Sequence, residues 1–125
     1  MEYNMIGWFE IPVTDMDRAK AFYEAVFDIT ISVHDLDGLI MGWFPSATGK
    51  KGASGSLVQH SMYIPSTTEG PLLYFTCEDL TKELSRVEGA SGTILKQKTE
   101  IGGGYGFMAL IKDTEGNRIA LHSQI

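Results

Sequence analysis

The sequence lacks most features that mark a secreted, membrane or nucleic-acid-binding protein. Its single cysteine, Cys77, excludes an intrachain disulfide framework. Ten basic residues stand against sixteen acidic ones, a net charge of −6, so the chain lacks the basic face that phosphate-rich partners need. The opening MEYNMIGWFEIP has neither a basic start nor an unbroken apolar run. We therefore expect a cytoplasmic protein that binds neither nucleic acid nor membranes.

The composition is that of a globular domain. A chain of 125 residues with 43% hydrophobic content is long enough to bury a core, so residues 1–125 are predicted to form a single domain. In its first half, alternation around Phe9, Ile11 and Val13 predicts a strand over 8–13. Asp15 then precedes a helical apolar pattern, and two further strands are expected over 38–44 and 56–60.

The second half repeats this order. A strand begins at Leu72, Asp79 precedes a second helix, and strands are expected over 93–95, 107–111 and 118–123. One shift of 64 residues carries Trp8 to Leu72 and Asp15 to Asp79, and it also aligns Trp43 with Phe107. Such a repeat predicts an α+β fold of two tandem βαβββ modules. Module one covers about 5–60, a linker covers 61–70, and module two covers about 71–124.

These segments resemble the vicinal oxygen chelate superfamily, which includes glyoxalase I, bleomycin resistance proteins and extradiol dioxygenases. The resemblance is carried by WFEIPVTDMDRAKAFYEAVF, with its Phe22-Tyr23 pair, by LLYFTCEDL and by GGYGFMALIKDTEGNRIALHS. It extends over roughly 5 to 124 and implies curled mixed sheets around a cleft, in a homodimer. The reaction is not implied, because one fold can host many activities.

The resemblance also gives positions for a metal site. Metal-dependent members place ligands on the first and last strand of each module, positions that fall here on Trp8, Ser56, Leu72 and Ala120. Indole, leucine and alanine side chains offer no lone pair, and a serine hydroxyl is a poor ligand for a divalent ion. We expect no family-type metal. A zinc, nickel, iron or manganese ion would fit only if this assignment of positions is wrong.

Strand alternation predicts which residues line the cleft. If Trp8 and Ala120 point into it, then Glu10 and His122 lie on the same side of their strands. Trp43, Leu72 and Tyr74 would complete an aromatic pocket, and Tyr105 in the glycine run GGGYG would stack on a flat ligand or pack at the rim. Glu10 and His122 are the candidate catalytic residues, as general base or ligand-orienting groups. The alternative is a salt bridge or solvated side chains at the edge of the sheets.

Three other features are assigned structural roles. The segment TGKKGASG, 48–55, matches no phosphate-binding motif, so we expect a hairpin or pocket rim that would also suit a lid. His34 is predicted to lie in a polar turn. Cys77 is predicted to face the helix as a buried apolar side chain.

The sequence supports three functions. The first is a non-catalytic protein that binds a small organic molecule in an aromatic cleft without the family metal. The second is a glyoxalase-like lyase, isomerase or dioxygenase that acts on a small substrate through Glu10 or His122. The third is a regulatory subunit that uses its sheets to contact partners.

Overall fold

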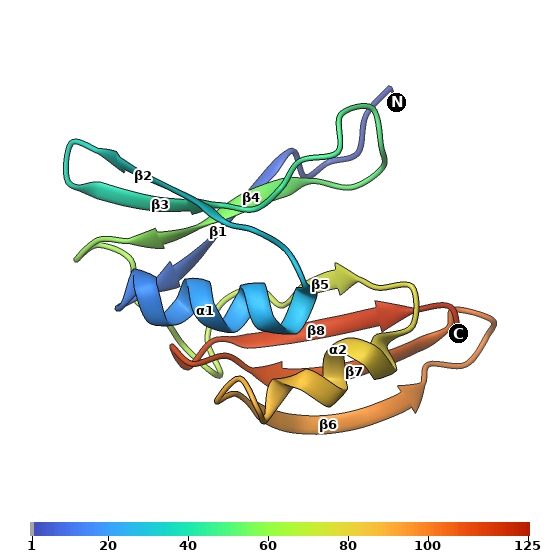
Figure 1. Ribbon diagram of the computed structural model, residues 1–125. Helices are drawn as coiled ribbons and strands as arrows, with labels where there is room; N and C mark the ends of the chain where they lie inside the picture. Colours follow the sequence, from blue (N-terminus) through green and yellow to red (C-terminus); the bar gives the residue numbers. More distant parts are fainter. Residues whose placement is uncertain (1) are drawn as a thin grey trace.

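The computed structural model describes residues 2–125, which form two modules of the same design (Figure 1). Module one contains β1 (Trp8–Val13), α1 (Met16–Phe27), β2 (Ser32–Leu36), β3 (Leu39–Trp43) and β4 (Ser54–Gln59). Module two contains β5 (Leu73–Thr76), α2 (Leu80–Val87), β6 (Thr93–Glu100), β7 (Phe107–Lys112) and β8 (Arg118–Ser123). The predicted α+β fold of two tandem βαβββ units is confirmed.

Each module folds into one four-stranded mixed sheet. The strand orders are β1-β4-β3-β2 and β5-β8-β7-β6, and the first strand of each module runs parallel to the last. Two parallel strands need a long crossover connection between them. In each module the helix that follows the first strand is part of that connection. The remaining pairs are antiparallel. The last strand of each module is therefore an interior strand.

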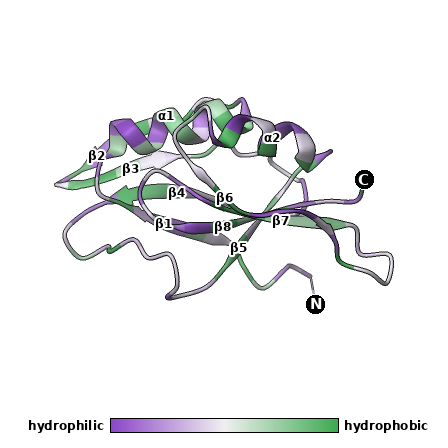
Figure 2. Ribbon diagram, turned by 90° about the horizontal axis from the view of Figure 1, so that it is seen from below, coloured by the Kyte–Doolittle hydropathy of each residue, from purple (hydrophilic) through white to green (hydrophobic). Residues whose placement is uncertain are grey.

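The molecule has two layers, with both helices on one side of the sheets (Figure 2). Side chains that face the helices form a single core across the two modules, including Ile11, Val13, Leu57, Ile111 and Leu121. We call the opposite surface of each sheet, turned away from the helices, its outer face. Alternation places Trp8 and Glu10 on the outer face of the first sheet, and Ala120 and His122 on that of the second.

Equivalent residues cap the two helices. Asp15 and Asp79 are the N-caps, as predicted, and their carboxylates accept hydrogen bonds from the amides of Arg18 and Thr81. The end of each module's last strand supplies a further acceptor. Gln59 Oε1 accepts from the Met16 amide at 2.6 Å, and Ser123 Oγ accepts from the Leu80 amide at 3.1 Å.

Tyr23 on α1 joins the modules at the centre of the core. It is fully buried, and its hydroxyl donates to Asp113 Oδ2 at 2.7 Å. Burial, with the adjacent Asp113 carboxylate, raises the pKa of Tyr23 well above its ordinary value. The hydroxyl therefore remains a proton donor that ties α1 to the β7–β8 hairpin.

Glu115 in the same hairpin completes the N-terminus of α1. Its carboxylate accepts from the amides of Thr14 and Asp15, each at 2.9 Å, and from Arg18 Nε at 2.7 Å. Its side chain is fully buried in this contact. An anion is favourable at a helix N-terminus because the first amides there have no partner within the helix. Module two thus supplies a cap for the helix of module one.

Two details of the sequence prediction are wrong. His34 lies in β2, a strand that the sequence patterns did not predict, and not in a turn. The turn is Asp37-Gly38, whose φ angles of 56° and 90° suit a two-residue hairpin connection. The shift of 64 holds for β1 and β4 but not for β3. Trp43 pairs with Ser56 and Leu110 pairs with Ala120, so Trp43 corresponds to Leu110 and not to Phe107.

None of the helices in the described chain is long and apolar enough to cross a membrane.

Candidate functional site

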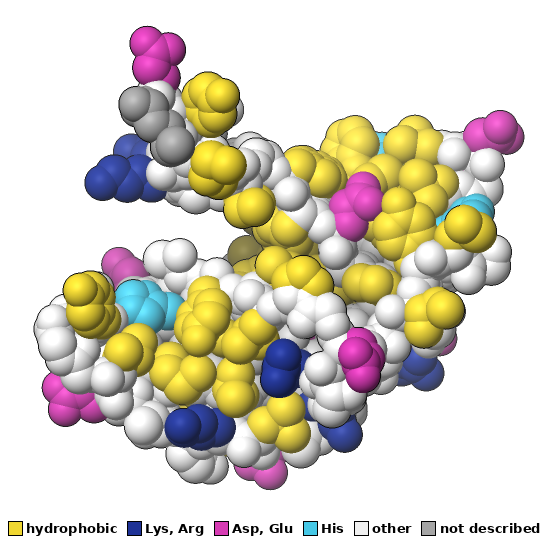
Figure 3. All heavy atoms as spheres, turned by 180° about the vertical axis from the view of Figure 1, so that it is seen from behind, with side chains coloured by type: hydrophobic (Ala, Val, Ile, Leu, Met, Phe, Trp, Pro, Cys, Tyr) yellow, Lys and Arg dark blue, Asp and Glu magenta, His cyan; other side chains and the backbone are white. Residues whose placement is uncertain are grey.

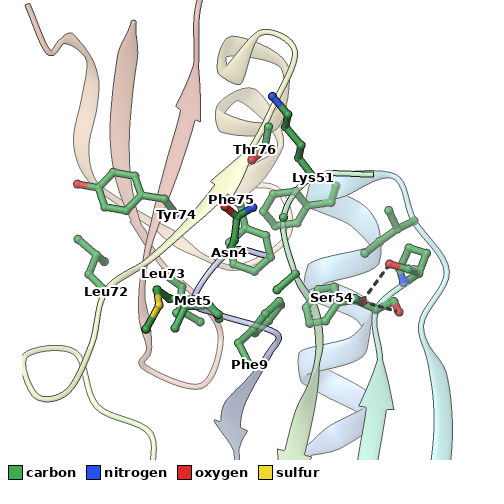
Figure 4. Close-up of a pocket in the computed structure, with 17 residues that line it drawn as sticks. Asn4, Met5, Phe9, Lys51, Ser54, Leu72, Leu73, Tyr74, Phe75 and Thr76 are labelled. Atoms are coloured by element: carbon green, nitrogen blue, oxygen red, sulfur yellow. Dashed lines mark hydrogen bonds between the residues drawn. The ribbon is translucent and has the colours of Figure 1, made fainter. Parts of the chain in front are cut away.

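A cavity of about 650 Å³ lies between the two modules. Its aromatic floor consists of Phe9 on β1, Phe27 at the end of α1, Phe44 just after β3 and Phe75 on β5 (Figure 4). The Phe27 and Phe75 ring centroids are 4.9 Å apart, and those of Phe9 and Phe44 are 5.5 Å apart. A cavity of this size with an apolar lining matches typical small-molecule sites.

The position of Phe9 depends on a glycine in the neighbouring strand. Phe9 pairs with Gly55 of β4 in parallel register, and the Phe9 ring occupies the space where a Gly55 side chain would lie. Phe44 is anchored beside it, because its amide donates to the Gly55 carbonyl at 3.0 Å. The two rings therefore lie against strand backbone, which holds the floor in place.

The rim of the cavity comes from three segments far apart in the chain. Residues 4–6 contribute Asn4, Met5 and Ile6, the loop before β4 with the first residue of β4 contributes 51–54, and the start of module two contributes 72–76. Ser54 does not offer its hydroxyl proton to a ligand, since it donates to the carbonyls of Phe44 and Pro45. The segment TGKKGASG, predicted to be a hairpin or rim, does lie at this rim.

Of the eight side chains predicted to bind or act on a ligand, only Leu72 and Tyr74 line this cavity. Trp8, Glu10 and Trp43 lie on the outer face of the first sheet, and Ala120 and His122 lie on that of the second. Tyr105 is exposed in the loop between β6 and β7. The sequence did not predict the four phenylalanines of the floor. Alternation assigns two of them, Phe9 and Phe75, to the helix-facing core.

The two candidate catalytic residues have separate partners. Glu10 Oε1 accepts from the Tyr63 hydroxyl at 3.0 Å, a bond that raises the pKa of Tyr63. His122 Nε2 lies 2.7 Å from the Tyr105 carbonyl oxygen, so this nitrogen donates. No hydrogen bond or ion pair joins Glu10 to His122 within residues 2–125. Their predicted catalytic role stays a prediction.

The outer faces carry exposed aromatic side chains. Trp8 is 47% exposed and Trp43 38% on the first sheet, and Tyr74 is 54% exposed on the second. The His34 and Trp43 rings lie with their centroids 3.9 Å apart and their planes tilted by 31°. Figure 3 shows apolar side chains gathered on both parts of this surface, with a hollow between them. Exposed apolar patches of this kind are common at sites where a protein contacts another molecule.

The four family metal positions do not form a ligand set. Ser56 and Ala120 are fully buried in their strands, and Trp8 and Leu72 carry no donor suitable for a metal ion. Among residues 2–125 no group of three or more His, Cys, Asp or Glu side chains is arranged to hold a metal ion. The residues present do not fit the family metal.

Cys77 behaves as predicted for a buried apolar side chain. It is 9% exposed, and burial raises the pKa of its thiol to about 12. A thiol with so high a pKa has little nucleophilic character near neutral pH.

Comparison with solved structures shows the same fold in proteins of low sequence identity. The antibiotic-binding protein TnmS3 from Streptomyces sp. CB03234 is 21% identical with a TM-score of 0.68, and the match covers 98% of each chain. The fosfomycin resistance protein FosX from Listeria monocytogenes is 14% identical with a TM-score of 0.67, over 98% of this chain and 92% of that one.

Glyoxalase I from Zea mays is also similar, at 18% identity and a TM-score of 0.68. The match covers 94% of this chain and 45% of the maize protein, so this chain spans about half its length. No curated protein sequence gives a significant match. The model of one family matches residues 5–121, and the chain therefore belongs to the Glyoxalase/Bleomycin resistance protein/Dioxygenase superfamily.

Proposed function

We propose that this protein binds a small organic molecule in the cavity between its modules, without a metal of the family type. The observation that carries the proposal is the phenylalanine floor under a cavity of about 650 Å³. Aromatic rings offer a flat ligand both apolar burial and favourable edge or offset contacts. The rim holds a few polar groups around this floor, the usual composition of a ligand site.

Two observations favour a binding protein over an enzyme. Glu10 and His122 lie on different sheets and have separate partners, so no acid–base pair converges on the cavity. The four metal positions also lack the donors that metal-dependent chemistry would need. TnmS3, an antibiotic-binding protein, matches this chain along its whole length and supports the same proposal.

Ligand binding is tested by calorimetry and thermal shift with a panel of aromatic drugs, catechols and glutathione thiol adducts. We expect saturable binding of at least one flat aromatic compound, with the same affinity after dialysis against a chelator. Met5→Asp places a carboxylate at the rim, where Met5 is 77% exposed, and should weaken binding about tenfold without loss of stability.

Met62→Asp is the matched control, because Met62 is as exposed as Met5 but lies in the linker away from the cavity. Loss of binding in the control variant, or a requirement for zinc, nickel, iron or manganese, would contradict the proposed site. Binding of no compound in the panel would argue against a binding function for this cavity.

We also propose that two copies pair through their outer faces. The outer face of the first sheet carries Trp8 and Trp43 around a single carboxylate, Glu10. The outer face of the second carries Tyr74 on one edge strand and the cations Lys96, Lys112 and Arg118 on the other three strands. One face is therefore complementary to the other in charge, and a two-fold axis would bring each first sheet against the partner's second sheet.

Trp43→Glu should shift the dimer to monomer, measured by sedimentation velocity, because it buries a second carboxylate in the proposed interface. Val33→Glu is the control. Val33 is 45% exposed in the same sheet but points to the side opposite Trp43, so its dimer should persist. A wild-type protein that sediments as a monomer at all concentrations would rule out this assembly.

A further inference from the structure

The loop before β4 presents a lysine to the cavity. Residues 44–53 connect β3 to β4, and Gly49 and Gly52 adopt left-handed φ angles of 76° and 92° that bend the chain toward the rim. Lys51 lies in this bend and lines the cavity, whereas the adjacent Lys50 does not. The residue at the same distance before β8 is Glu115. Its carboxylate already accepts hydrogen bonds at the N-terminus of α1.

Lys51 is the only formally charged side chain among the cavity's lining residues within the described chain. It forms no ion pair with any residue from 2 to 125, in a protein whose net charge is −6. Its ammonium group therefore remains available to a ligand at the edge of an apolar cavity.

Two neutral donors lie near the same opening. Thr76 and Asn4 line the cavity, and neither side chain hydrogen-bonds to another residue in the described part of the chain. In Figure 4, Lys51 and Thr76 lie at the same end of the pocket, and the Asn4 side chain projects over Phe75. The polar side-chain groups gathered at this end of the cavity are thus an ammonium, a hydroxyl and an amide, above a floor of phenyl rings, whereas the Tyr74 hydroxyl points away from it.

We infer that the ligand of this cavity is an aromatic carboxylate, with its ring on the phenylalanine floor and its carboxylate at Lys51. The inference rests on the proposed binding function and adds the class of ligand. An ammonium and a hydroxyl are both suitable donors to a carboxylate, and a charged acceptor strengthens each hydrogen bond. Because Lys51 is exposed, the ion pair is screened by water and salt, so its contribution to affinity is modest.

The test compares two ligands of the same shape, naphthoate and the neutral naphthalenemethanol, by calorimetry at low salt. Wild-type protein should bind naphthoate about fivefold more tightly than the alcohol, the effect expected for one partly exposed ion pair. Lys51→Met should remove this preference by weakening naphthoate binding alone. Lys50→Met, which changes the neighbouring lysine outside the cavity, should leave the preference intact.

The outcomes separate the inference from the function on which it rests. If all three proteins bind both compounds equally well, or if Lys50→Met has the same effect as Lys51→Met, the carboxylate inference is wrong while the binding function stands. If wild-type protein binds neither compound, both fail for this cavity. A preference that disappears in high salt and in Lys51→Met, but not in Lys50→Met, supports the inference.

Discussion

Replacing Gly55 with alanine is expected to lower the free energy of unfolding by about 3 kcal/mol, the upper end for overpacking a core. A Cβ atom at this position would overlap the backbone oxygen of Phe9 and lie 2.6 Å from carbons of its ring. The backbone oxygen belongs to the paired strand β1, so it cannot move without disturbing the β1–β4 ladder. The ring would have to leave the floor of the cavity.

Chemical denaturation measures this loss, and Gly7→Ala is the matched control. Gly7 lies just before β1, and a Cβ atom there would meet nothing within 4 Å. Its unfolding free energy should stay within about 0.5 kcal/mol of wild type, as for most surface changes. A Gly55→Ala protein as stable as the control would show that Phe9 is not held against Gly55, and the cavity floor would need another explanation.

Replacing Glu115 with alanine is expected to cost about 3 kcal/mol, because it leaves the amides of Thr14 and Asp15 without this acceptor and removes the partner of Arg18. Burial alone would raise the pKa of Glu115. Hydrogen bonds from Arg18, Asp15, Thr14 and Thr114 outweigh that effect and hold the pKa at about 2. The carboxylate is thus charged and strongly bound in the folded protein.

This depressed pKa gives the loss a pH dependence of known sign. In the unfolded chain a glutamate titrates near about 4.3, so the stabilisation is complete above that pH and is lost as the pH falls toward about 2. The stability difference between wild type and Glu115→Ala should therefore be largest near neutrality and shrink between these values. Asp79, whose pKa is also about 2, is present in both proteins and cancels in the difference.

Urea denaturation of the two proteins across that pH range provides the measurement. Glu78→Ala removes an exposed carboxylate with no hydrogen-bond partner in the described chain, and it should change stability little at any pH. A difference between wild type and Glu115→Ala that stays constant with pH would show that the Glu115 carboxylate is not bound as the structure places it.

The sequence was sufficient for most of the fold because alternation and capping are local signals. Strands β1 and β8 were predicted with their observed bounds, and Asp15 and Asp79 were recognised as caps. Strand β2 was missed although its turn, Asp37-Gly38, is a strong hairpin signal. The misalignment of Trp43 with Phe107 followed from extending one shift across a β3–β4 connection that is longer than its counterpart.

The cavity could not be predicted from local patterns. Alternation assigns Phe9 and Phe75 correctly to the helix-facing side, where an apolar ring is expected to be core. Whether such rings pack in the core or line a cavity depends on how closely β1 and β5 approach each other. That distance is set by the packing of the two modules. The position of Lys51 at the cavity could not be predicted either. The segment TGKKGASG indicates a glycine-rich hairpin or rim, but not which cavity that rim borders.

The cap that Glu115 places on α1 has a consequence for the order in which the protein is made and folded. Glu115 follows Thr14 by 101 residues, a length that a ribosome adds in roughly 5–20 s. Throughout that interval α1 has been synthesised, but the amides of Thr14 and Asp15 at its N-terminus lack the Glu115 carboxylate as acceptor. During synthesis, module one therefore lacks both this cap and the second module's share of the common core until the β7–β8 hairpin has been made.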